Sequence, residues 1–211
     1  ATQGPVIIAF PGLAPISDAL FCTGLWTAVL HAAGSAPCSA AFYAYHEEAS
    51  AATWAVEQSR RGGGRPIIIV GYGYGGAAAG ECARLLMSHD QPVALLITAD
   101  AIKKSRVGFT TGTTLGIMTL DKGLPGVSGV NLAYVSPPSC DGRLLQRHVN
   151  YYQTDSTIRH GAFIPGATEN HCIVRDASGA VSHATIDNRL SPDITADLRV
   201  FFPDAPSGDA R

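Results

Sequence analysis

Residues 66–76 read PIIIVGYGYGG, and this stretch is the strongest indication of the fold class in the sequence. Pro66–Val70 is a short, mostly β-branched run, which is typical of a strand buried on both faces of a parallel sheet. It leads directly into a glycine-rich turn, Gly71–Gly76, and then into an alanine-rich segment that predicts a helix up to about His89. A strand, a tight turn and a helix in this order are typical of a β-α-β unit.

The same alternation continues on both sides of this stretch. Further strands are predicted at Pro5–Phe10, Cys38–Tyr45, Val93–Thr98 and Gln146–Gln153, and apolar periodicity returns at Val130–Val135. Helices are predicted at Ser17–Ala33, Ser50–Arg60 and Ser191–Phe202. The pattern predicts one α/β domain over residues 1–211, with a mainly parallel sheet of about six strands and helices on both faces. Pro66–Val70 should be a central strand.

One segment departs from this pattern. Lys103–Ser128 is rich in glycine, threonine and serine and has little clear period. It is either an insertion that could cover a site as a lid, or a plain surface loop.

Composition excludes several classes of protein. Of the 211 residues, 46% are hydrophobic and 15% are charged, which excludes an intrinsically disordered chain. The net charge of −2 gives no basic surplus for binding nucleic acid. No apolar run is long enough to span a bilayer, and no signal peptide is visible. The five scattered cysteines form no CxxC pair, so we expect free thiols, a cytoplasmic location and neither metal nor cofactor.

The glycine-rich turn has the context of a nucleophile elbow. In that motif, G-x-S-x-G, a serine stands between two glycines on a sharp turn from strand to helix. Gly71 and Gly75 match the flanking glycines, but Gly73 stands at the serine position. Such sites also need backbone N–H groups to bind an oxyanion, and Leu13 and Tyr74 are the candidates.

A carboxylate and a histidine follow the turn in the order that a catalytic triad of this type requires. Asp100 comes at the exit of a predicted strand, and His183 precedes the last predicted helix. Asp155 is a competing acid, because it follows the next predicted strand. We expect His183 above Gly73, with its second ring nitrogen facing Asp100 or Asp155.

From Pro5 to Phe202 the chain resembles a small α/β-hydrolase of the lipase, esterase and thioesterase type. The resemblance is carried by Phe10–Leu13, Gly71–Gly76, Leu96–Asp100, Val149–Gln153 and Ser182–Asp187. It implies hydrolysis of a small-molecule or lipid-like acyl ester or thioester through an acyl-enzyme. It also implies His183 as general base, Asp100 as its orienting acid, and Tyr72 as a pocket wall. Gly73, whether it is natural or introduced, has no hydroxyl, so the protein with this sequence should be nearly inert.

Two alternatives use the same residues. Gly71, Gly73 and Gly76 also fit the G-x-G-x-x-G dinucleotide-binding pattern, with Asp100 placed 24 residues after the last glycine as the ribose-binding acid. That pattern normally follows the first strand of its domain, whereas two strand-helix units precede this one. The other alternative is a non-catalytic binding protein on a hydrolase scaffold.

Overall fold

A computed structural model describes residues 4–12, 23–34, 36–101, 141–154, 161–174, 179, 181 and 185–202. These residues form a six-stranded sheet in which every neighbouring pair is parallel, in the order β2-β1-β3-β4-β5-β6. The strands are β1 (Val6–Phe10), β2 (Ser39–Phe42), β3 (Ile67–Tyr72), β4 (Leu95–Ala99), β5 (His148–Gln153) and β6 (Glu169–Ile173). The predicted α/β fold with a central Pro66–Val70 strand is confirmed.

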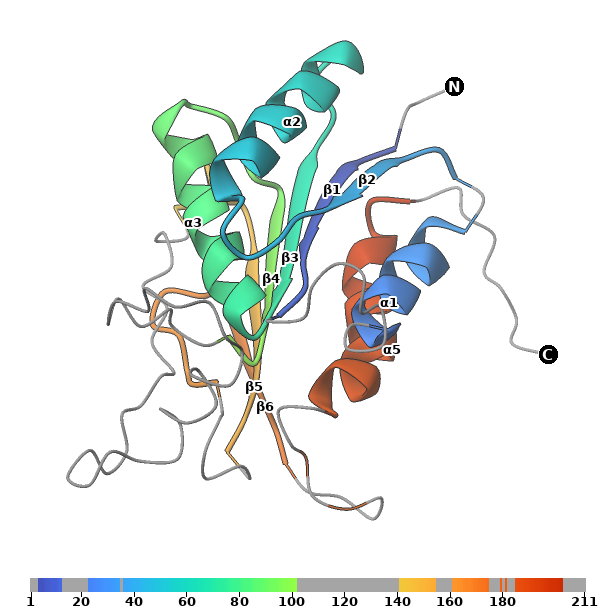
Figure 1. Ribbon diagram of the computed structural model, residues 1–211, viewed down its shortest axis with the longest axis vertical. Helices are drawn as coiled ribbons and strands as arrows, with labels where there is room; N and C mark the ends of the chain where they lie inside the picture. Colours follow the sequence, from blue (N-terminus) through green and yellow to red (C-terminus); the bar gives the residue numbers. More distant parts are fainter. Residues whose placement is uncertain are drawn as a thin grey trace, which may run out of the picture.

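Helices cover both faces of the sheet (Figure 1). On one face lie α2 (Glu48–Arg61) and α3 (Tyr74–Ser88), and on the other lie α1 (Thr23–Ala33) and α5 (Ile186–Arg199). The inner strands are buried on both faces because parallel strands are joined by helices that pack over the sheet.

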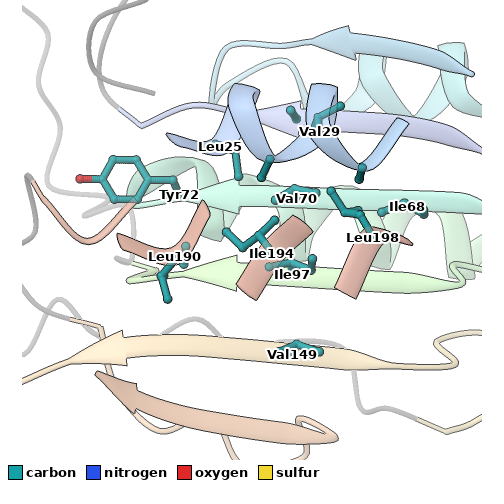
Figure 2. Packing of buried hydrophobic residues seen from close by; sticks show 14 of the residues in the cluster. Leu25, Val29, Ile68, Val70, Tyr72, Ile97, Val149, Leu190, Ile194 and Leu198 are labelled. Carbon is teal, nitrogen blue, oxygen red and sulfur yellow. The ribbon is translucent and has the colours of Figure 1, made fainter. Parts of the chain in front are cut away.

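Side chains alternate along the inner strands between two hydrophobic clusters. Figure 2 shows the cluster beneath α1 and α5, to which β3 contributes Ile68, Val70 and Tyr72. Ile67 and Ile69, which alternate with these residues along the strand, point to the other face and belong to the cluster beneath α2 and α3. This is why β3 begins with a continuous apolar run and not an alternating one.

The last strand of the described sheet was missed in the sequence. β6 (Glu169–Ile173) was not predicted, and Val130–Val135 lies outside the described residues, as does the candidate lid Lys103–Ser128. β6 has the sequence ENHCI and is partly exposed, so it lacks the apolar signal of a buried strand.

Other boundaries differ by a few residues. The predicted strand Cys38–Tyr45 is reduced to β2, Ser39–Phe42. Helix α5 begins at Ile186, five residues before the predicted start at Ser191, and it contains Pro192. Helix α1 ends at Ala33 as predicted, and Gly34 follows it with φ 54°. A positive φ just after a helix favours glycine because it has no Cβ.

Candidate functional site

The turn between β3 and α3 has an unusual backbone at Gly73. Gly73 follows the last residue of β3 and precedes the first residue of α3, with φ 58° and ψ −123°. Its N–H donates to the carbonyl of Ala99 at 3.0 Å, and its own carbonyl accepts from the N–H of Gly76 at 2.9 Å. Residues with a side chain rarely adopt this conformation, and a sharp turn of this kind between a central strand and a helix is typical of a functional site.

The neighbouring glycines are required by close packing. A Cβ at Gly71 would overlap the carbonyl of Gly75, and a Cβ at Gly75 would overlap the carbonyl of Phe10. A Cβ at Gly76 would come within 2.5 Å of the Cβ of Ala101. The glycines therefore bring α3 against the ends of β1 and β4, and they place the turn where the strand order reverses between β1 and β3. Ligands of open α/β sheets bind at this point.

Asp100 lies beside Gly73 at the same edge of the sheet. Tyr72 pairs with Ala99 in the parallel ladder, so Gly73 and Asp100 are the next residues on the two neighbouring strands. Asp100 is fully buried and has φ 48°, a left-handed conformation that is uncommon outside glycine. The structure thus brings together two of the predicted site residues.

The carboxylate of Asp100 is held from the β5 side. Its Oδ1 accepts from the N–H of Gln153 at 3.3 Å and from the N–H of Gly161, and its Oδ2 accepts from the side-chain amide of Gln153 at 3.1 Å. Neither Gln153 nor Gly161 was among the site residues predicted from the sequence. The only signal for Gln153 is its position at the end of β5, the strand that pairs with β4, which Asp100 follows.

The two tyrosines of the turn differ in their surroundings. Tyr72 is only 6% exposed and belongs to the cluster beneath α1 and α5. Figure 2 shows its hydroxyl at the end of β3, directed away from the aliphatic side chains. Tyr74 is half-buried, and its ring lies 6.0 Å from that of Tyr45, which in turn contacts His46 at 5.3 Å. Tyr45 and His46 follow β2, and the sequence analysis did not select them.

Three predicted site residues, Leu13, Asp155 and His183, lie outside the described residues. Tyr74, the second oxyanion candidate, begins α3, and the N–H groups of a helix's first turn point out of its N-terminus. Among the described residues no group of three or more histidine, cysteine or acidic side chains could hold a metal ion. No helix in the described part of the chain is long and apolar enough to cross a membrane.

A second group of polar side chains lies on β4 and β5. The hydroxyl of Thr98 donates to the Asn150 side chain at 2.9 Å and lies 3.0 Å from Nε2 of His148. His148 is fully buried, and burial lowers its pKa to about 4. This imidazole is neutral at physiological pH, and its described hydrogen-bond contact is with Thr98, not with Asp100 or Gly73. The backbone N–H of His148 donates to the hydroxyl of Thr168 at 2.9 Å.

Solved structures with a similar fold include thioesterases and an esterase. Human thioesterase 2 matches with a TM-score of 0.55 at 10% identity, over 100% of both chains. The type II thioesterase BorB from the borrelidin biosynthetic cluster matches with a TM-score of 0.51 at 16% identity, over 94% of each chain. An arylesterase matches with a TM-score of 0.55 at 13% identity, over 95% of this chain and 77% of its own.

No protein-family model matches the sequence, and a comparison with curated proteins gives no match. The assignment therefore depends on the three-dimensional structure. Together with the parallel sheet and its covering helices, the structural matches show that the chain has an α/β-hydrolase-like fold.

Proposed function

We propose that this chain is an acyl hydrolase of the esterase or thioesterase type whose nucleophile position is occupied by Gly73. The observation that carries the proposal is the backbone of Gly73, which has φ 58° and ψ −123° between a central strand and its helix. A turn this sharp presents a residue at the edge of the sheet, as a nucleophile elbow does. The thioesterases and the arylesterase of similar fold support an acyl ester or thioester as the substrate class.

The proposed site has three parts. Asp100, beside Gly73, is the acid that orients the imidazole of His183. With serine at position 73, His183 would take the hydroxyl proton while the oxygen bonds to the acyl carbon. The N–H groups of Leu13 and Tyr74 would bind the oxyanion. His183 would then return the proton to the departing alcohol or thiol, and water would release the acid from the acyl-enzyme.

Two features of the described residues support Asp100 and His183 in these roles. Asp100 follows Ala99, whose carbonyl accepts the N–H of Gly73. Val181, two residues before His183 in the chain, is buried in the same cluster as Tyr72. Asp155 is the alternative acid, and variants of the two aspartates distinguish them.

Gly73 itself favours a second candidate. Since glycine supplies no oxygen to attack a carbonyl, the protein as written could bind an acyl ligand without turning it over. The dinucleotide alternative has less support, because the glycine-rich turn follows β3 and not the first strand of the sheet.

The Gly73→Ser variant tests the proposal with a nitrophenyl acylate and a simple acyl thioester. We expect hydrolysis at least about 10³-fold faster than by the parent, since removing a catalytic serine typically costs that much or more. The matched control Gly73→Ala adds a Cβ without a hydroxyl and should stay inert. Activity should disappear again on adding His183→Ala, and on adding Asp100→Asn but not Asp155→Asn.

Two other outcomes would favour one of the alternative functions. A folded Gly73→Ser variant that is no faster than Gly73→Ala contradicts the hydrolase proposal and favours a binding protein. Tight binding of a nicotinamide or flavin dinucleotide by the parent would favour the dinucleotide alternative instead.

A further inference from the structure

Gln153 is a buried glutamine whose side chain reaches Asp100. It is the last residue of β5, and both Gln153 and Asp100 have no exposed surface. The side-chain amide donates to Oδ2 of Asp100 at 3.1 Å, and the backbone N–H of the same residue donates to Oδ1 at 3.3 Å. One residue thus contacts both oxygens of the carboxylate.

Gly161 supplies another donor from a different segment. Its N–H also donates to Oδ1 of Asp100. A Cβ at this position would come within 2.8 Å of Oδ1 and 2.9 Å of the Asp100 Cα. The close approach therefore requires glycine at position 161, and three N–H groups converge on one carboxylate. An ionised carboxylate, which only accepts hydrogen bonds, matches a set of donors of this kind.

The backbone of Asp100 is fixed as well. Its N–H donates to the carbonyl of Tyr151 at 2.7 Å, and its φ of 48° is uncommon for a residue with a side chain. Such a conformation persists only where the surrounding structure enforces it. The backbone N–H of Asp100 is therefore bound by β5, and its carboxylate is bound by β5 and by the segment that contains Gly161.

We propose that Gln153 is a positioning residue that holds the Asp100 carboxylate in the orientation in which it orients His183. This inference rests on the proposed function, because it takes Asp100 as the acid of the site. Hydrogen bonds to an ionised acceptor are about twice as strong as those between neutral groups. The amide of Gln153 therefore restrains rotation of the carboxylate more firmly than a neutral pair would.

The imidazole of His183 gives a readout that a merely structural residue would not move. Its titration can be followed by ¹⁵N NMR in the protein as written, without a nucleophile, and its signals are identified by their loss in His183→Gln. Asp100→Asn should lower the midpoint by about 1 pH unit or more, because a neighbouring anion stabilises imidazolium. Gln153→Met keeps the length of the side chain but removes the donor, and should lower the midpoint by about half a unit or more.

Two further variants make the measurement decisive. Thr98→Val removes a buried hydroxyl that contacts His148 and Asn150, and should leave the midpoint unchanged. Gln153→Asn retains the amide but is one methylene too short, so it replaces Gln153→Met if that variant does not fold. A shift with Asp100→Asn but with neither Gln153 variant overturns the positioning role and leaves the proposed site intact. No shift with Asp100→Asn contradicts the proposed site, and the role of Gln153 with it.

Discussion

Gly73 and Asp100 lie side by side at the edge of the sheet, and both have a positive φ. What makes this backbone conformation possible differs between the two residues. Gly73 has no Cβ and adopts its conformation at little cost. Asp100 has a side chain, so its conformation is stabilised by the contacts of its backbone and carboxylate with Tyr151, Gln153 and Gly161. Serine at position 73 would be strained by about 1–3 kcal/mol, which is the usual range for such conformations. The Gly73→Ser variant should therefore be less stable than the parent.

His148 predicts how stability depends on pH. Its Nδ1 is buried and has no hydrogen-bond partner among the described residues, and burial lowers its pKa to about 4. The unfolded chain takes up a proton near pH 6.5, before the folded protein does. The contribution of His148 to stability is therefore complete above about pH 6.5 and is lost as the pH falls towards 4.

The expected loss between pH 7 and pH 5 is about 2 kcal/mol in the free energy of urea unfolding. His148→Gln removes the titrating ring and should abolish this part of the pH dependence, whatever its effect at pH 7. Equal slopes in the parent and His148→Gln would contradict the neutral, buried state of the imidazole.

Among the elements, the continuous apolar strands could be predicted from the sequence and the polar edge strand could not. β1 and β3 are apolar runs whose residues are all buried. In β6, by contrast, Glu169 accepts from Arg147 at 2.7 Å, and the ring of His171 stacks on that of Tyr151. These partners come from β5 and from the residue before it, so no local pattern in the sequence indicates the strand.

The site divides in the same way. The neighbouring positions of Gly73 and Asp100 could be predicted because a glycine turn after a strand, and a carboxylate at a strand exit, are local signals. Gln153 could not, since it is 53 positions from Asp100 in the chain and a polar residue at a strand end has many roles. The start of α5 was placed too late because Pro192 is typical of a first turn, whereas here it lies inside the helix.

The close contact of α3 with the end of β1 can be tested by adding a methyl group at Gly75. Gly75→Ala would place a methyl group against the carbonyl of Phe10, so the helix must move from the sheet. We expect a loss of about 3 kcal/mol or more in the free energy of urea unfolding, at the upper end of overpacking effects. Gly63→Ala is the matched control, because a Cβ there meets nothing within 4 Å and only its φ of 75° opposes the change. It should cost about 1 kcal/mol. Equal losses would show that α3 does not pack closely on β1.

For the whole molecule, the fold brings Gly73 and Asp100 together at one edge of the parallel sheet. β3 and β4 both end at this edge, and Phe10 and Pro11, at and just after the end of β1, meet α3 there. The fold alone does not determine activity, since similar scaffolds carry unrelated functions. Activation of a nucleophile at position 73 therefore has to be tested directly.

The most direct test is the intact mass of the Gly73→Ser variant after reaction with a fluorophosphonate. An activated serine oxygen displaces fluoride from phosphorus, and the proton leaves with the general base. We expect one adduct per chain, located on the peptide that contains position 73, and strongly reduced labelling when His183→Ala is added. The parent and Gly73→Ala should remain unlabelled. A folded Gly73→Ser variant that gains no adduct, or one labelled equally well without His183, would show that position 73 is not where a nucleophile is activated.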